Sequence, residues 1–94
     1  MALLDDNEIT QRLETSQWGR VENAIQRDFE FKDFAQAMEF VNVVAALAEE
    51  RNHHPDILVH GWNNVRLTLS THSSGGLTQN DLDLSRGIDG LSTG

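Results

Sequence analysis

Two adjacent histidines, His53 and His54, stand directly before Pro55, the only proline of the chain. A third histidine, His72, ends a run of alternating apolar and polar residues. Because the ordinary pKa of imidazole is about 6.5, histidine can both accept and donate a proton near neutral pH. Such a set favours acid–base chemistry, for example a dehydration, in which one group removes a proton while another protonates the departing hydroxyl.

One carboxylate lies close to this pair in the sequence, because Glu49 precedes His53 by one helical turn. If the helix extends that far, the two side chains share a face and the carboxylate favours the charged imidazole. The simpler interpretation is a surface pair that contributes roughly 0.2–0.5 kcal/mol. The fourth histidine, His60, is interpreted as a surface or capping residue in a Val-His-Gly-Trp turn.

A metal site is the rival interpretation, since imidazole binds zinc, copper and iron. Adjacent histidines are poor ligands for one ion, however, and the chain has no His-Glu-x-x-His motif. The absence of cysteine excludes disulfides and thiolate zinc sites. No sequence resembles a serine nucleophile elbow either. Acid–base chemistry that needs no metal or cofactor is therefore the preferred prediction.

Composition limits the remaining classes of function. The 94 residues are expected to form one domain, residues 1–94, with a single modest core. Seven cationic side chains against 15 acidic ones give a net charge of −8, which disfavours direct binding of nucleic acid. No apolar run is long enough to span a membrane, and the acidic start does not resemble a signal peptide. We expect a cytoplasmic protein, which the lack of cysteine suits.

The first third of the chain predicts a helix followed by a hairpin. Residues 5–14 carry acidic residues suited to a helix N-terminus, with apolar positions one turn apart. Residues 24–31 alternate between apolar and polar, which is typical of a half-buried strand, and residues 18–23 are expected to pair with it. Arg27 interrupts the apolar face, so we expect it near an edge, with its charged end reaching solvent.

Residues 33–52 form the clearest predicted helix. Asp33 and Gln36 resemble a capping box, and the helix should end near Asn52 or His53 because Pro55 forbids continuation. The apolar positions recur at helical spacing and form a wide stripe, expected to cover a sheet and also to meet another subunit. They are Phe34, Ala37, Met38, Phe40, Val41, Val44, Ala45, Leu47 and Ala48.

The last part of the chain predicts two more strands and a helix. Residues 56–60 and 64–72 have strand patterns, the second ending at the third histidine. Residues 77–91 predict a final helix, with Thr78 as N-cap and Asp81 three residues later. The predicted fold is α+β in the order α-β-β-α-β-β-α, a four-stranded antiparallel sheet with the helices packed on one face.

Several linked motifs resemble the pterin-4a-carbinolamine dehydratase family. They are "AEERNHHPDI", "GWNNVRLTLSTH" and "GGLTQNDLDLSRGID", in that order. The matching residues are Glu49, His53, His54, Pro55, Trp62, Thr71, His72, Gly76, Leu77 and Thr78. Trp18 and residues 25–49 also look like the family, so the resemblance covers roughly residues 10–90.

The resemblance implies the same fold and a reaction, the loss of water from 4a-hydroxytetrahydropterin to give quinonoid dihydropterin, without a metal or cofactor. It implies that His53 and His72 are the acid–base pair and that His54 positions the substrate and assists. Glu49 and Asp81 would orient histidines. The residues implied to line the pocket are Pro55, Thr71, Ser73 and Ser74, the two serines mainly through backbone groups.

This sequence departs from the family pattern at one position, and the resemblance also implies possible partner proteins. The aromatic residue after His-His-Pro is often tyrosine in the family, whereas here it is Trp62 after Gly61, so a stacking face remains but a hydroxyl is lost. Family members associate as dimers or tetramers. Some act as dimerisation cofactors of a transcription factor or assist the assembly of other enzymes. The alternative function is therefore a non-catalytic scaffold with the same fold.

Overall fold

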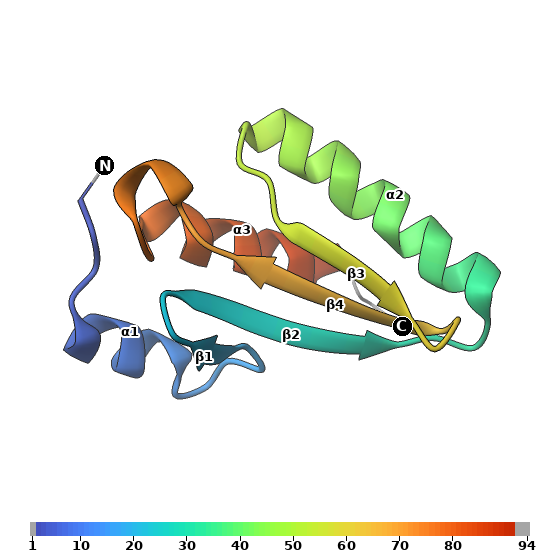
Figure 1. The fold of residues 1–94 in the computed structure, drawn as a ribbon, viewed down its shortest axis with the longest axis horizontal. Coiled ribbons are helices and arrows are strands. Elements are labelled where there is room, and N and C mark those ends of the chain that lie inside the picture. The colour runs from blue at the N-terminus through green and yellow to red at the C-terminus, as the bar shows by residue number, and fades with distance from the viewer. Residues whose placement is uncertain (1, 92–94) are drawn as a thin grey trace.

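The computed structural model describes residues 2–91 and has the predicted order of elements (Figure 1). Its helices and strands are α1 (Asp6–Leu13), β1 (Gly19–Val21), β2 (Ala24–Glu30), α2 (Phe34–Arg51), β3 (Asp56–His60), β4 (Asn64–Leu69), a short 3-10 turn η1 (His72–Ser74) and α3 (Gln79–Leu91). None of the helices in residues 2–91 is long and apolar enough to cross a membrane.

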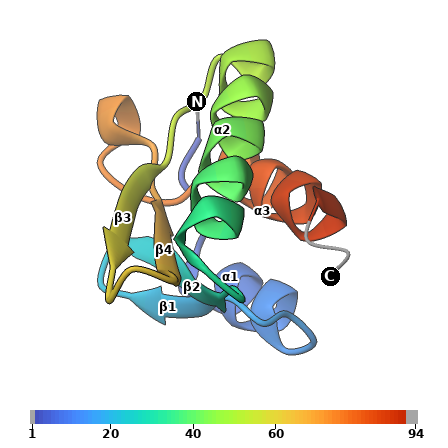
Figure 2. The same ribbon diagram turned by 90° about the vertical axis from the view of Figure 1, so that its right-hand side faces the viewer.

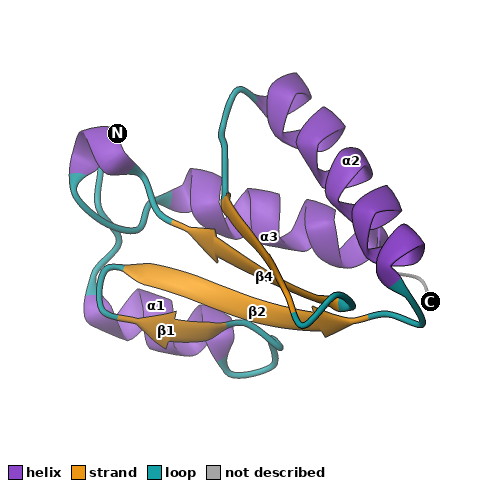
Figure 3. Ribbon diagram, turned by 45° about the vertical axis from the view of Figure 1, so that its right-hand side comes forward, coloured by secondary structure: helices purple, strands orange, loops and turns teal. Residues whose placement is uncertain are grey.

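The four strands form one antiparallel sheet in the order β1-β2-β4-β3 (Figure 3). The helices α2 and α3 lie on one face of this sheet (Figure 2). The two hairpins, β1–β2 and β3–β4, are joined through the central pair of β2 and β4, so β1 and β3 are the edge strands. The predicted α+β fold class is confirmed.

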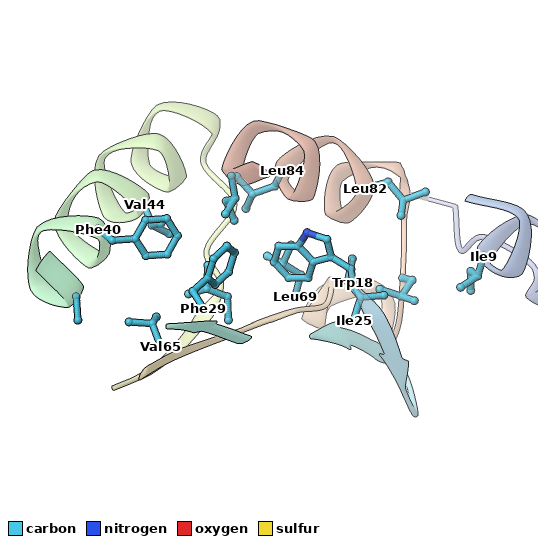
Figure 4. Packing of buried hydrophobic residues seen from close by; sticks show 14 residues of the cluster. Ile9, Trp18, Ile25, Phe29, Phe40, Val44, Val65, Leu69, Leu82 and Leu84 are labelled. Atoms are coloured by element: carbon cyan, nitrogen blue, oxygen red, sulfur yellow. The ribbon is translucent and has the colours of Figure 1, made fainter. Parts of the chain in front are cut away.

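Alternate residues of the two central strands contribute to the core. Figure 4 shows how the buried hydrophobic residues pack. Ile25 and Phe29 of β2, and Val65, Leu67 and Leu69 of β4, point to the helix-covered face and are buried. Burying each of these side chains contributes about 1.5–3 kcal/mol. The same cluster includes Ile9 of α1, Trp18, Ala37, Phe40 and Val44 of α2, and Leu77, Leu82, Leu84 and Ile88.

Arg27 lies on this apolar face because its charge is matched there. Its Nη1 atom lies 2.5 Å from Oδ1 of Asp89 on α3, and its guanidinium lies 4.4 Å from the centre of the Phe29 ring. Asp89 also accepts a hydrogen bond of 2.8 Å from Nε1 of Trp18. The strand β1 begins at Gly19, opposite Gln26, so at Arg27 the strand β2 has a neighbour only on its β4 side. Arg27 therefore lies at a local edge of the sheet, as expected. Its guanidinium pairs with Asp89, however, and does not extend into solvent.

The predicted capping box of α2 is confirmed, since Oδ1 of Asp33 accepts a 2.8 Å hydrogen bond from the backbone N–H of Gln36. Part of the predicted apolar stripe is buried in the single chain. Ala37, Phe40, Val44 and Ala48 are buried, and Met38, Val41 and Leu47 are partly buried. Phe34, expected in the stripe, and Val43 remain exposed. One side of α2 therefore covers the sheet, and Phe34 and Val43 lie outside that buried side.

The end of α2 fixes the direction in which the two histidines leave it. The helix ends at Arg51, and Asn52 takes the left-handed conformation with φ of 51°. The backbone N–H of Asn52 and that of His53 both bond back to the last turn of the helix, at Ala48 and Glu49. Asparagine tolerates this conformation better than most residues, which makes it a common helix terminator.

Candidate active site

A buried carboxylate, Asp81, ties together three segments of the chain. Its side chain has no exposed surface, and its Oδ2 atom accepts hydrogen bonds from the hydroxyl of Thr71 at 2.7 Å and the backbone N–H of Thr78 at 2.9 Å. Its other oxygen, Oδ1, lies 2.6 Å from Nε2 of His53. A buried carboxylate is tolerated only when donors surround it, and Asp81 has three.

Asp81 sets the proton arrangement around it. The ionised carboxylate can only accept, so Nε2 of His53 carries the proton and donates it. The single hydroxyl hydrogen of Thr71 goes to Asp81, so the hydroxyl of Thr78 donates to Thr71, 2.8 Å away. The His53 side chain is only 14 % exposed. Its second ring nitrogen, Nδ1, is therefore the one that does not face Asp81, on an imidazole held in a fixed orientation.

The condition for a pair of Glu49 and His53, a helix that extends to His53, is not met, and the pair does not form. Oε2 of Glu49 instead lies 2.5 Å from Nε2 of His54, and both side chains are more than half exposed. The reason is the left-handed Asn52, which ends the helix before His53 can share a face with Glu49. The two histidines consequently have separate carboxylate partners, one exposed and one buried.

The strand β4 is shorter than predicted, and this changes the setting of His72. The strand ends at Leu69, and Thr71 forms an isolated bridge with Gly76. His72 begins the turn η1, in which the backbone carbonyl of Thr71 accepts hydrogen bonds from Ser74, Gly75 and Gly76. Gly75 has φ of 76°, a left-handed conformation that glycine adopts without strain. His72 itself is exposed.

The predicted site residues mostly gather at one end of the sheet. Because β3 and β4 are antiparallel, the start of β3 lies beside the end of β4, with Asp56 opposite Thr68. The histidine pair and Pro55 lead into the start of β3, while Thr71, His72, Ser73 and Ser74 follow the end of β4 (Figure 1). Asp81 joins the two sides by binding both His53 and Thr71. We call His53, His54 and His72 the histidine site.

Trp62 is the predicted site residue that the fold places elsewhere. It lies in the turn between β3 and β4, at the opposite end of that hairpin from the histidines (Figure 1). Its side chain is 62 % exposed, and its backbone φ is 59°. At about 3.4 Å per residue, the four steps from Asp56 to His60 alone span about 13 Å. Trp62 therefore does not reach the histidines of its own chain.

Two clefts within residues 2–91 lie away from the histidine site. The larger, about 590 Å³, is bordered by β2, the first half of α2 and Leu91, and the smaller, about 190 Å³, lies between α1 and α3. His54 and His72 are both exposed. Within residues 2–91, no three His, Asp or Glu side chains form a metal-binding group. His54 and His72 therefore lie at the surface of the single chain, whereas most of the His53 side chain is covered.

Sequence reasoning missed one part of this site, the hydroxyl pair of Thr71 and Thr78. Thr78 was expected only to cap α3, and Thr71 only to line a pocket. In the structure both residues hold Asp81, and the spacing Thr-x-x-Asp that predicted a helix start is also the signal for this contact. The arrangement holds one histidine, His53, in a fixed orientation against a buried carboxylate.

Comparisons with known proteins agree with this picture. The family described as "Pterin 4 alpha carbinolamine dehydratase" matches residues 2–91. A protein of Thermomicrobium roseum, named as a candidate pterin-4-alpha-carbinolamine dehydratase, is 47 % identical over 94 residues, covering 99 % of this chain and 100 % of the relative.

Two solved structures have a similar fold. A protein from Brucella melitensis described as a transcriptional coactivator/pterin dehydratase superposes with a TM-score of 0.89 at 34 % identity, over 97 % of this chain and 99 % of that one. A pterin dehydratase-like protein described as a RuBisCO assembly factor in the alpha-carboxysome gives 0.70 at 26 % identity, over 84 % and 93 %. Since the family matches nearly the whole chain and the fold agrees, the chain belongs to the pterin-4-alpha-carbinolamine dehydratase family.

Proposed function

We propose that this protein is a 4a-hydroxytetrahydropterin dehydratase, which removes water from the 4a-carbinolamine to give quinonoid dihydropterin in tetrahydropterin recycling. The observation that carries the proposal is the link through Asp81, which holds His53 at 2.6 Å and binds Thr71, the residue directly before His72. Family membership supports the same substrate class.

The reaction needs one proton removed and one delivered. A base takes the proton from N5 of the pterin, the C4a–N5 bond becomes double, and the C4a–O bond breaks as an acid protonates the hydroxyl, which leaves as water. In this proposal His53 and His72 share the two roles, since each can accept or donate a proton near neutral pH. Proton transfers of this kind typically contribute about 10²–10⁴-fold to the rate.

Asp81 and His54 have supporting roles in this proposal. Asp81 fixes the orientation of His53 and stabilises the positive charge that the ring gains when it accepts a proton. His54, held by Glu49 at 2.5 Å, is exposed and positions the pterin. Pro55, Thr71, Ser73 and Ser74 lie beside the histidines in the sequence and complete the surface that the flat ring would contact.

The proposal includes an assembly of identical chains, a homodimer or homotetramer. Large apolar side chains are exposed on two elements, Phe34 and Val43 on α2 and Ile57 and Leu58 on β3. These exposed side chains support the proposed assembly, since apolar surface left uncovered on a soluble protein often marks an interaction site. No direct contact with nucleic acid or membrane is proposed, and the expected location is the cytoplasm.

The proposal is tested by following dehydration of the 4a-carbinolamine spectroscopically, with the folded protein against buffer alone. We expect a rate well above that of the buffer reaction. A rate equal to the buffer reaction would refute the enzyme. Combined with a stoichiometric partner recovered in a pull-down, it would favour the scaffold function that the description of the alpha-carboxysome relative suggests. The intact set of three histidines favours the enzyme.

A further inference from the structure

Thr78 precedes α3, and its hydroxyl faces another threonine rather than the backbone of that helix. A threonine that caps a helix normally accepts a hydrogen bond from a backbone N–H two or three residues further on. Here the backbone N–H of Asp81 bonds to the backbone carbonyl of Thr78, at 3.1 Å. The Thr78 hydroxyl lies 2.8 Å from the hydroxyl of Thr71. The start of α3 therefore does not account for this hydroxyl.

We propose that Thr78 is a positioning residue for the dehydration, and that it acts on His53 through Thr71 and Asp81. This inference rests on the proposed function for the reaction that is affected. The link from Thr78 to His53 does not depend on that function and can be measured without substrate. Thr78 has no exposed surface, so its effect on the reaction has to pass through other residues.

The hydrogen bonds of this link run in one direction, from Thr78 to Asp81. Each threonine hydroxyl has one hydrogen to donate, and an ionised carboxylate can only accept. Thr71 donates its hydrogen to Oδ2 of Asp81 at 2.7 Å, so its oxygen accepts the hydrogen that Thr78 supplies. Because hydrogen bonds in a chain polarise one another, the donation by Thr78 strengthens the one that Thr71 makes to Asp81.

The two oxygens of Asp81 have different partners. Oδ2 is held by the hydroxyl of Thr71 and by the backbone N–H of Thr78 at 2.9 Å. Oδ1 lies 2.6 Å from Nε2 of His53. A carboxylate is planar, so donors that fix one oxygen also fix the direction of the other. The position of Oδ1, and with it the orientation of the His53 imidazole, therefore depends on both threonines.

Burial prevents water from replacing the Thr78 hydroxyl. Thr78 and Asp81 are both 0 % exposed, and Thr71 is 7 % exposed. A buried polar group that loses its partner cannot turn to solvent and stays unpaired. Without the Thr78 hydroxyl, the oxygen of Thr71 loses its donor and the hold on Oδ2 of Asp81 weakens. We therefore expect a looser His53 imidazole.

The variant Thr78→Val isolates this hydroxyl. Valine has the same branched shape as threonine and keeps the backbone N–H that bonds to Asp81. A change at Thr71 would be less selective, since its backbone N–H and carbonyl also hold the turn that carries His72.

Ser85→Ala is the matched control on the same helix. Ser85 is 5 % exposed, and its hydroxyl donates to the backbone carbonyl of Leu82 at 2.7 Å. The variant therefore removes a buried hydroxyl of α3 that does not bond to Asp81. It should leave both the orientation of His53 and the rate of dehydration unchanged.

The link is tested first by proton NMR, without substrate. The Nε2 proton of His53, identified by its absence in His53→Ala, should exchange slowly with water, because the side chain is only 14 % exposed and the proton bonds to Asp81. In Thr78→Val its exchange should be about three- to tenfold faster, as expected for the loss of one hydrogen bond. Unchanged exchange, or equally fast exchange in Ser85→Ala, would overturn the link.

The role in the reaction is tested by kinetics. Thr78→Val should lower kcat by about three- to tenfold with little change in KM, and Thr78→Ser should restore most of the loss. In the Asp81→Asn background the same change should have a smaller effect, since the two residues act through one link. A purely structural role would give the same loss in both backgrounds and would contradict the proposal.

The two measurements separate this inference from the proposed function. If exchange is faster in Thr78→Val but kcat is unchanged, Thr78 holds His53 and has no role in the reaction, which overturns the proposal. If the wild type does not dehydrate the carbinolamine at all, the proposed function fails, and the role in the reaction fails with it. The exchange of the Nε2 proton still decides whether Thr78 acts on His53.

Discussion

The Nε2 atom of His53 lies 2.6 Å from Oδ1 of Asp81, a carboxylate whose side chain has no exposed surface. The two residues are 28 positions apart in the sequence and come from different elements, the end of α2 and the first turn of α3. Through Thr71 the same carboxylate also reaches the loop that carries His72. The chain thus holds the imidazole of His53 in place, while His54 and His72 are exposed.

Asp81→Asn should lower kcat by about 10–10²-fold while KM changes little. The amide can still accept hydrogen bonds from Thr71 and Thr78, but it no longer stabilises a positive charge on His53, and general acid–base catalysis depends on that charge. Measurement of kcat and KM over pH 5–9 checks this. A purely structural role for Asp81 would leave the shape of the pH profile unchanged, and such a result would contradict the prediction.

Asp89→Ala should reduce the free energy of unfolding by about 1–3 kcal/mol, because it leaves two largely buried donors unpaired. These are Nη1 of Arg27, 2.5 Å away, and Nε1 of Trp18, 2.8 Å away. Chemical denaturation measures the change. Asp83→Ala is the matched control on the same helix, since Asp83 is exposed and should cost much less. Equal losses in both variants would argue against the buried cluster.

Asp28→Asn should lower stability at pH 7 by a small amount that vanishes in acid. The hydrogen bond from Arg66, at 2.8 Å, together with its charge, holds the pKa of Asp28 below its usual value. A depressed folded-state pKa means that the contribution is complete above the ordinary pKa of aspartate. It is lost as the pH falls through the depressed value.

Urea denaturation at pH 7 and near pH 2 measures that difference, with Glu14→Gln as an exposed control. Because both partners are exposed, 1 M salt should also reduce the effect. An effect of Asp28→Asn that persists near pH 2 would contradict the assignment to the ion pair.

Much of the fold was predictable because local patterns agree with the sheet and its helices. The alternation in residues 24–31 placed Ile25 and Phe29 on the buried face, and Asp33 with Gln36 marked the start of α2. The end of β4 was misplaced, since the pattern of alternation continues to His72 while hydrogen bonding stops at Leu69. Alternation reports which face a residue takes, and not whether a partner strand is present.

The site was less predictable because its decisive contacts join distant positions. Glu49 and His53 have helical spacing, yet one left-handed residue, Asn52, separates their directions. The partner of His53 is Asp81, a contact that depends on how α3 packs, and no local pattern shows it. Trp62 belongs to the same sequence motif as the histidines but lies at the other end of the hairpin. A motif lists residues without saying where the fold places them.

The most direct measurement is the rate of carbinolamine dehydration by the wild type, His53→Ala, His72→Ala and the double variant. The account predicts a wild-type rate well above buffer and a loss of about 10²-fold or more in each single variant. The double variant should be little slower than either single one, because groups that act as one unit are not additive. Circular dichroism checks that each variant is folded. Wild-type turnover that persists in both single variants would contradict the catalytic role of this site.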